Sequence, residues 1–157
     1  MSMLDDEKQQ LRKQAAKQRS LAQQANAHAA DDIASFAEAL ISRYQPRIVA
    51  AYWPIRSEID PIPLLSALSA QGAQTCLPVT PAEGLPLQFH HWQIGTALAD
   101  GPYQTKQPFA DAPVLVPDLI LAPLLAFDKA CWRLGYGGGF YDRTIAALEQ
   151  AGHKVSL

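Results

Sequence analysis

The sequence predicts an α/β domain built on a mainly parallel β-sheet. Short apolar runs alternate along the chain with stretches of helical spacing, the order in which parallel strands and crossover helices occur. The apolar runs are continuous, as expected for strands that are covered on both faces. With 157 residues, 48% of them hydrophobic, the chain can bury one core. We therefore expect residues 1–157 to form a single domain.

The amino-terminal part of the chain is expected to be helical. From Asp5 to about Ala30 it is rich in Gln, Ala, Lys and Arg and contains no Gly or Pro, so its intrinsic helix preference is strong. A second helix is expected to begin at the acidic pair 31–32, which suits a helix amino end, and to end at Pro46.

Three apolar runs predict buried strands, at residues 47–53, 74–79 and 118–122. Helices are expected at 61–71 and 142–151, each followed by a glycine, and residues 153–157 are expected to begin another strand. The region 80–117 holds many of the 12 prolines, and we expect loops there around one or two edge strands, including one at 87–92. Ligands of parallel sheets gather at the carboxyl ends of the strands, where the segments after Trp53, Leu77 and Ala122 lie in this interpretation.

A glycine-rich segment lies between a predicted strand and a predicted helix. Its four glycines, at positions 135 and 137–139, leave room for backbone amides to turn toward a phosphate, although a flexible turn explains them equally well. Arg133 and Arg143 flank the glycines and could bind phosphate oxygens, while Asp142 could hold a magnesium ion. The aromatic side chains within the segment could flank a planar ring or fill the core.

Other candidate residues are open to two interpretations each. Lys8 and Arg12 are four residues apart, so they share a helix face that could contact a polyanion or simply be solvated. Glu58 follows a strand end and could accept bonds from a pterin or serve as a loop carboxylate. Trp53 and Trp92 could wall an aromatic ligand, although a tryptophan is more often part of the core.

Several function classes are disfavoured. The 13 basic and 15 acidic residues lack the cationic excess typical of nucleic-acid binding. No apolar run resembles a signal peptide or a membrane span, so we expect a cytoplasmic protein. His90 and His91 are expected on opposite faces of a strand and are given no role. Cys76 and Cys131 lack metal-ligand spacing, and Cys131 is expected to be a buried free thiol rather than a modifiable one.

The combination of motifs resembles the 5-formyltetrahydrofolate cyclo-ligase family, also called methenyltetrahydrofolate synthetases. The most specific part is the glycine-rich segment from Arg133 to Arg143, preceded by Ala126-Phe-Asp-Lys129 and Asp118-Leu-Ile-Leu-Ala-Pro123. Lys8-x-x-x-Arg12 and Ala51-Tyr-Trp-Pro-Ile-Arg-Ser-Glu58 give further support. The resemblance implies a three-layer Rossmann-like fold of the type found in sugar-phosphate isomerases and CoA-transferases.

The resemblance also implies an activity: cyclisation of 5-formyltetrahydrofolate to 5,10-methenyltetrahydrofolate, dependent on ATP and Mg²⁺, with release of ADP and phosphate. The formyl oxygen attacks the γ-phosphoryl group, N10 closes on the activated carbon, and phosphate leaves. Such a transfer needs positioning and charge neutralisation more than a protein nucleophile. The partners implied are these small molecules, and the protein is expected to be a monomer or a weak homo-oligomer.

The resemblance assigns roles to individual residues. Catalysis is assigned to Lys8, Arg12, Arg133 and Tyr141, and the magnesium ion to Asp142. Folate contacts are assigned to Trp53, Glu58, Tyr136, Gly137, Gly138, Gly139 and Phe140. The nucleotide contacts are Lys8, Arg12, Arg133, Leu134, Gly135, Tyr136, Gly137, Gly138, Gly139, Phe140 and Tyr141.

Two features depart from the family pattern. Gln107 stands where many relatives place a glutamate. The sequence stops at Leu157, whereas relatives continue through further strands and usually supply a second acidic residue near the metal, so we expect the family's C-terminal strands to be lacking. One alternative is therefore a catalytically impaired, truncated homologue that binds nucleotide or folate. Another, by analogy of fold alone, is a sugar-phosphate enzyme.

Overall fold

Three helices precede the first strand in the computed structural model, which describes residues 2–157. They are α1 (Met3–Ala25), α2 (Ala29–Ala34) and α3 (Ala37–Tyr44). The predicted continuation of the first helix to Ala30 was wrong. The side-chain oxygen of Asn26 accepts a 3.0 Å bond from the His28 amide, and its Nδ2 donates to Asp32 at 3.2 Å. These bonds stabilise a turn in place of further helix.

The central sheet has five strands in the order β6-β3-β2-β1-β7. Their bounds are β1 (Ile48–Ala50), β2 (Gln74–Val79), β3 (Gln88–His91), β6 (Val114–Leu115) and β7 (Leu119–Ile120). Strand β1 runs parallel to both β2 and β7, and Ser156 forms a further parallel bridge to Leu119. Helix α4 (Ile62–Ala70) connects β1 to β2. The predicted α/β class with a parallel centre is confirmed.

Strand β3 is not at the edge of the sheet, contrary to the prediction for residues 87–92. It pairs antiparallel with β2 on one side and with β6 on the other, and Phe89 and His90 are buried. The strand at this edge is β6, a two-residue strand preceded by Pro113 and followed closely by Pro117. Proline has no backbone N–H donor, and an edge strand tolerates this because one of its sides has no partner strand. Strands β4 (Ala99–Asp100) and β5 (Lys106–Gln107) form a separate hairpin around the 3-10 helix η1 (Pro102–Gln104).

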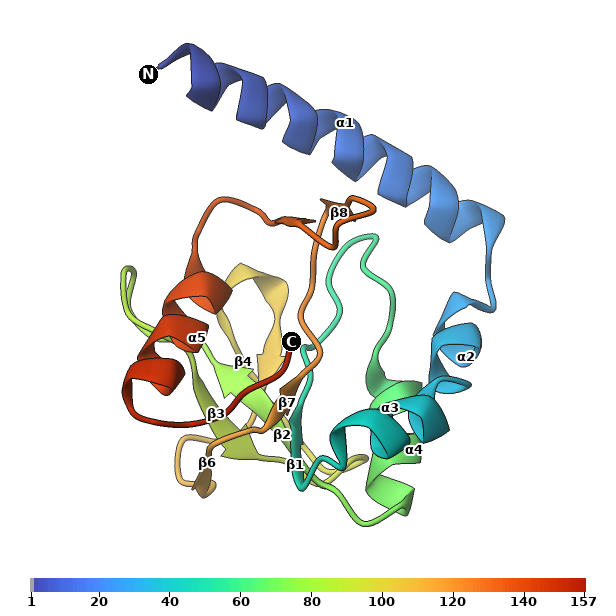
Figure 1. Cartoon of the computed structure of the whole chain (residues 1–157), viewed down its shortest axis with the longest axis vertical. Helices are drawn as coiled ribbons and strands as arrows, with labels where there is room; N and C mark the ends of the chain where they lie inside the picture. Colours follow the sequence, from blue (N-terminus) through green and yellow to red (C-terminus); the bar gives the residue numbers. More distant parts are fainter. Residues whose placement is uncertain (1) are drawn as a thin grey trace.

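Helices cover both faces of the sheet, as Figure 1 shows, with α2, α3 and α4 on one side and α5 (Phe140–Gln150) on the other. The side chains of β1 alternate accordingly. Val49 packs in a core cluster with Leu65 and Leu68 of α4, while Ala50 packs in a second cluster that includes Ile120 and Leu148. The layers match the three-layer arrangement that was expected. Kinship with sugar-phosphate isomerases stays a prediction.

Helix α1 lies across one end of the molecule, above the loops that connect strands and helices (Figure 1). None of its residues is buried, so polar contacts rather than a packed apolar face hold it. Within residues 2–157, no helix combines the length and the apolar character that spanning a bilayer requires. Beneath α1, strands β8 (Ala126–Phe127) and β9 (Arg133–Leu134) form a hairpin that leads into the glycine-rich loop.

Candidate active site

Three loops meet beneath α1, and Arg19 contacts all three. Its Nε donates to Ser57 Oγ at 2.9 Å, in the loop after β1, and its Nη1 donates to the Leu124 carbonyl at 2.9 Å, in the loop after β7. Nη1 also donates to the hydroxyl of Tyr136, in the glycine-rich loop. Because β1 and β7 are parallel, their carboxyl ends meet at one edge of the sheet. The candidate site thus lies where an α/β sheet places its ligands.

Arg12 lies directly on the glycine-rich loop. Its Nε donates to the Gly135 carbonyl at 3.1 Å. Gly137 has a φ of +98°, and a Cβ there would come within 3.2 Å of the Arg12 guanidinium carbon, so a side chain is disfavoured on both counts. Lys8 lies one turn earlier on the same helix face and is exposed. The salt bridges among residues 2–157 join Lys106 to Asp100 and Arg133 to Asp142, so Lys8 has no carboxylate partner there.

Tyr136 links the glycine-rich loop to Glu58. Its hydroxyl donates to Oε1 of Glu58 at 2.6 Å, and Oε2 of Glu58 accepts from the Ile55 amide at 2.8 Å. The Glu58 side chain is buried, with 7% of the residue exposed. Partial burial raises the pKa of Tyr136 to about 12, and the rise is opposed by Arg19 and reinforced by Glu58. Tyr136 therefore stays protonated near neutral pH and acts as a donor to the carboxylate.

The negative charge of Glu58 also affects the pKa values of two further tyrosines. Burial raises the pKa of Tyr141 well above its usual range, and the negative charge of Glu58 adds to the rise. The same two causes raise the pKa of Tyr52, whose hydroxyl donates to the Ile59 carbonyl at 2.7 Å. Tyr141 also packs against the second core cluster. The candidate site is therefore a buried carboxylate surrounded by neutral phenols.

Asp142 pairs with Arg133 at the mouth of the loop. The Oδ1 to Nη2 distance is 3.5 Å, and 85% of the Asp142 side chain is exposed. Nearby, Nη1 of Arg143 donates to the Gly138 carbonyl at 2.7 Å while its guanidinium lies 5.0 Å from the centre of the Phe140 ring. Within residues 2–157, no group of three or more His, Cys, Asp or Glu side chains could hold a metal ion. Asp142 is thus a single carboxylate beside two arginines.

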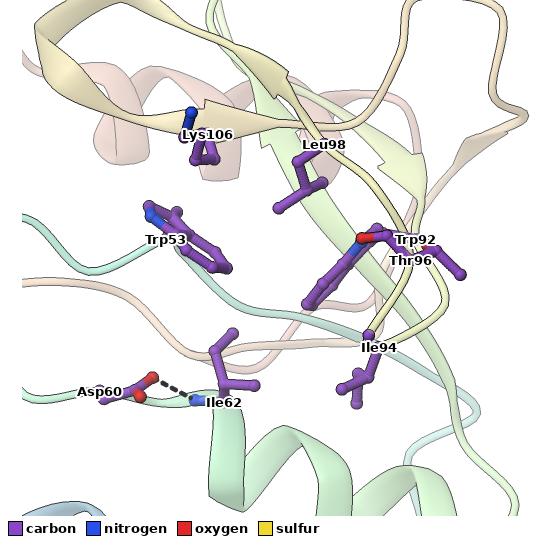
Figure 2. Close-up of a pocket in the computed structure, with 9 residues that line it drawn as sticks. Trp53, Asp60, Ile62, Trp92, Ile94, Thr96, Leu98 and Lys106 are labelled. Atoms are coloured by element: carbon purple, nitrogen blue, oxygen red, sulfur yellow. Dashed lines mark hydrogen bonds between the residues drawn. The ribbon is translucent and has the colours of Figure 1, made fainter.

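Trp53 faces a different cavity from the glycine-rich loop. Its ring meets Trp92 edge to face, with ring centres 6.3 Å apart, in an apolar cavity of about 500 Å³ (Figure 2). Asp60 and Lys106 also line this cavity, and the Asp60 carboxylate accepts a 2.9 Å bond from the Ile62 amide. No residue of the glycine-rich loop lines it. The structure therefore brings Glu58 to that loop but does not bring Trp53 there.

Arg19 is the residue at this site that the sequence analysis missed. It lies seven residues after Arg12, two helical turns along the same face, so the spacing of basic residues carried a usable signal. Gln107, noted as a departure from the family, accepts a 3.2 Å bond from the Thr80 amide through Oε1. A glutamate could accept the same bond, so the departure preserves this contact.

Two other residues are clarified by the structure. Cys131 is exposed, with a φ of +63° in the turn between β8 and β9, so the expectation of a buried thiol was wrong. The turn carries it out of the core. His90 is buried and contacts the Ala112 carbonyl through Nδ1 at 2.8 Å and Gln88 Oε1 through Nε2 at 3.1 Å. These contacts occupy both ring nitrogens, which agrees with a structural side chain.

The fold and the site together define an α/β protein whose glycine-rich loop adjoins a buried carboxylate at the carboxyl ends of parallel strands. Residues 5–157 match the model of the 5-formyltetrahydrofolate cyclo-ligase family, and the chain belongs to that family. The expected resemblance is confirmed.

Individual relatives show how far the similarity extends. A 5-formyltetrahydrofolate cyclo-ligase from Mycolicibacterium smegmatis is 41% identical over 106 residues, which cover 63% of this chain and 55% of the relative, little more than half its length. One from Haemophilus influenzae is 31% identical over 149 residues, covering 91% and 80%. The NMR structure of Aquifex aeolicus 5,10-methenyltetrahydrofolate synthetase superimposes with a TM-score of 0.71 at 26% identity, covering 88% of this chain and 72% of the other.

Proposed function

We propose that this chain binds ATP and 5-formyltetrahydrofolate and closes the folate to 5,10-methenyltetrahydrofolate, releasing ADP and phosphate. Family membership and the names of both cyclo-ligase relatives support the activity. The observation that carries the proposal is the hydrogen bond from Tyr136 to Glu58. Tyr136 belongs to the loop expected to wrap the nucleotide, and Glu58 is the carboxylate expected to hold the pterin. One contact therefore joins the two halves of a two-substrate site.

The nucleotide half of the proposed site consists of basic side chains around the glycine-rich loop. Arg12 is already in place against Gly135, and Lys8 extends the same helix face toward open solvent, where a triphosphate could be reached. Arg133 lies at the start of the loop, and residues 134–141 would surround the nucleotide. Such cations neutralise the charge of a transferring phosphoryl group, and this neutralisation is a main contribution of a protein to phosphoryl transfer.

The folate half of the proposed site centres on Glu58. A carboxylate offers about four acceptor positions, of which the Tyr136 hydroxyl and the Ile55 amide use two. A pterin N–H group could therefore be accepted at Oε2, while at Oε1 it would compete with the Tyr136 hydroxyl. Trp53 would contact the folate through the apolar cavity that it shares with Trp92, whose aromatic walls suit an aromatic ring. Gly137, Gly138, Gly139 and Phe140 would lie between the two substrates.

Asp142 fits the role of a magnesium ligand. Mg²⁺ keeps several waters and commonly uses one or two carboxylates together with substrate phosphates, so a single exposed aspartate is sufficient protein ligation. A magnesium ion held there would neutralise charge on the phosphates of ATP. Arg133, the present partner of Asp142, would then turn to a phosphate oxygen.

In the proposed reaction, the formyl oxygen attacks the γ-phosphorus, and the bond from this phosphorus to the bridging oxygen breaks as ADP leaves. N10 then attacks the formyl carbon and loses its proton, and the C–O bond breaks as phosphate leaves. Glu58 would orient the pterin, and Lys8, Arg12 and Arg133 would hold the phosphates in line. The raised pKa of Tyr141 keeps its phenol protonated, so it can donate a hydrogen bond but not act as a base. We further propose a cytoplasmic protein that is a monomer or a weak homo-oligomer.

An absorbance assay tests the proposal. The near-ultraviolet band of the methenyl product is expected to appear when the chain is mixed with 5-formyltetrahydrofolate, ATP and Mg²⁺, and not when any of the three is omitted. Binding of ATP or folate without the band would instead identify a non-catalytic binding protein. Saturable binding of a sugar phosphate, together with indifference to folate, would overturn the proposal in favour of a sugar-phosphate enzyme.

A further inference from the structure

Arg19 connects segments that are far apart in the sequence. Its three acceptors, on Ser57, Leu124 and Tyr136, lie 38, 105 and 117 positions away along the chain. Its guanidinium carbon is also 5.4 Å from the centre of the Tyr136 ring. A planar guanidinium holds five donors in a fixed geometry, whereas an ammonium offers three donors on a flexible stem. Arg19 is therefore built into the junction of the three loops.

Helix α1 depends on a small number of polar contacts. Arg12 bonds to Gly135, Arg19 to the three loops, and Nε2 of Gln23 to the Arg56 carbonyl at 3.4 Å, all from one face of the helix. None of the α1 residues is fully buried, and its half-buried apolar residues are the small Ala15 and Ala16, so little apolar packing would keep the helix in place if these bonds were lost. Among residues 2–157, Arg19 makes three of these five bonds from α1 to the loops, so it contributes the most bonds to the position of the helix over the glycine-rich loop.

From Arg19, a chain of hydrogen bonds leads to Glu58. The Tyr136 hydroxyl accepts from Arg19 and donates to Glu58 Oε1, and donation from a cation makes the hydroxyl a better donor in turn. The neighbours of Tyr136, Gly135 and Gly137, both lie against Arg12. A nucleotide that shifts Arg12 or the loop would therefore also shift Tyr136, and a pterin that bonds to Oε1 of Glu58 would compete with the same hydroxyl.

We propose that Arg19 is a positioning residue that couples the ATP site and the folate site to one another through Tyr136. The inference rests on the proposed function. Nucleotide binding at the loop withdraws the Tyr136 hydroxyl from Glu58, which frees the carboxylate oxygen for the pterin. Coupling of this kind is reciprocal, so folate must tighten nucleotide binding by the same factor as nucleotide tightens folate binding.

Titration calorimetry with the full chain tests the coupling. The affinity for 5-formyltetrahydrofolate is measured with and without a non-hydrolysable ATP analogue and Mg²⁺. In the unmodified chain the analogue should tighten folate binding roughly 5-fold or more. In Arg19→Met that factor should fall to near one, and in Arg19→Lys it should be only partly restored. Lys17→Met removes the same charge from an exposed position of α1, and in this variant the analogue should tighten folate binding as much as in the unmodified chain.

Tyr136→Phe breaks the link while leaving the other bonds of Arg19 intact, so it tests the coupling even if Arg19→Met does not fold. The substitution should raise folate affinity in the absence of nucleotide, because Oε1 of Glu58 then has no competing donor. It should also reduce to near one the factor by which the ATP analogue tightens folate binding. A purely structural role for Arg19 would lower both affinities and keep the factor, which overturns the inference. An unmodified chain that binds both ligands without coupling also overturns it. A chain that binds neither ligand defeats the proposed function itself.

Discussion

The hydroxyl of Tyr136 donates a 2.6 Å hydrogen bond to the buried carboxylate of Glu58, which lies 78 positions earlier in the sequence. The bond crosses from the loop after β9 to the loop after β1. It also leaves Glu58 with two donors, because the Ile55 amide bonds to the other oxygen. The two bonds satisfy both oxygens of the buried carboxylate and fix its orientation.

Glu58→Gln should weaken folate binding without weakening nucleotide binding. The substitution keeps the size of the side chain but removes its charge, and hydrogen bonds to charged groups are worth about 1.5–3 kcal/mol, which corresponds to roughly 10- to 150-fold in affinity. Titration of 5-formyltetrahydrofolate and of ATP separately provides the measurement. Glu83→Gln, at an exposed position, is the matched control. Equal loss of both affinities would show that Glu58 supports the fold and not the folate.

Asp142→Asn should raise the Mg²⁺ concentration needed for half-maximal turnover and slow phosphoryl transfer, with folate affinity intact. The reason is the loss of the exposed Asp142 carboxylate that would bind the ion. Thermal stability should change little, because exposed ion pairs such as Arg133 with Asp142 contribute about 0–1 kcal/mol. Activity measured over a range of Mg²⁺ concentrations gives the result, with exposed Asp111→Asn as control. Unchanged turnover at every concentration would remove Asp142 from the site.

The sequence predicted the local parts of this structure well. Residues 74–79 form β2 with the expected bounds, and the predicted helix at 61–71 is α4 at Ile62–Ala70. Both are bounded by strong local signals, with Pro61 at the start of the helix and Gly72 after its end. The break after α1 was missed because it depends on the Asn26 side chain, which competes with the helix through bonds that composition does not reveal.

Contacts between segments that are distant in the sequence could not be predicted from local sequence patterns. The family motif identified Glu58 and Tyr136 as members of one site, but only the fold shows that they bond directly. Trp53 is six positions after Arg47 in the same predicted strand region, yet its side chain faces the cavity shared with Trp92. Whether β3 was an edge strand depended on the pairing of β6, a strand of two residues with almost no sequence signal of its own.

Leu65→Ala should cost about 2–5 kcal/mol of unfolding free energy, the usual range for deleting a buried leucine side chain. Leu65 is fully buried in α4, in the core cluster that joins the helix to β1 and β2. Leu85→Ala removes the same atoms from a position that is 53% exposed and should change stability by no more than about 0.5 kcal/mol. Denaturant unfolding measures both. Similar costs at the two positions would contradict the core described for α4.

Stability should fall as pH rises from about 10 toward about 12, and Tyr136 should contribute to the fall. Its pKa is raised from 10.0 to about 12 in the folded chain, so the unfolded chain loses this proton first and is favoured as pH rises through that interval. Below pH 10 the contribution is fully present. In Tyr136→Phe no phenol can ionise at this position, so the denaturant midpoint should decline less steeply with pH. Tyr103 is 70% exposed, and Tyr103→Phe should decline as steeply as the unmodified chain. Parallel declines in all three proteins would show that Tyr136 is as easily ionised folded as unfolded, and that its bond to Glu58 does not persist in solution.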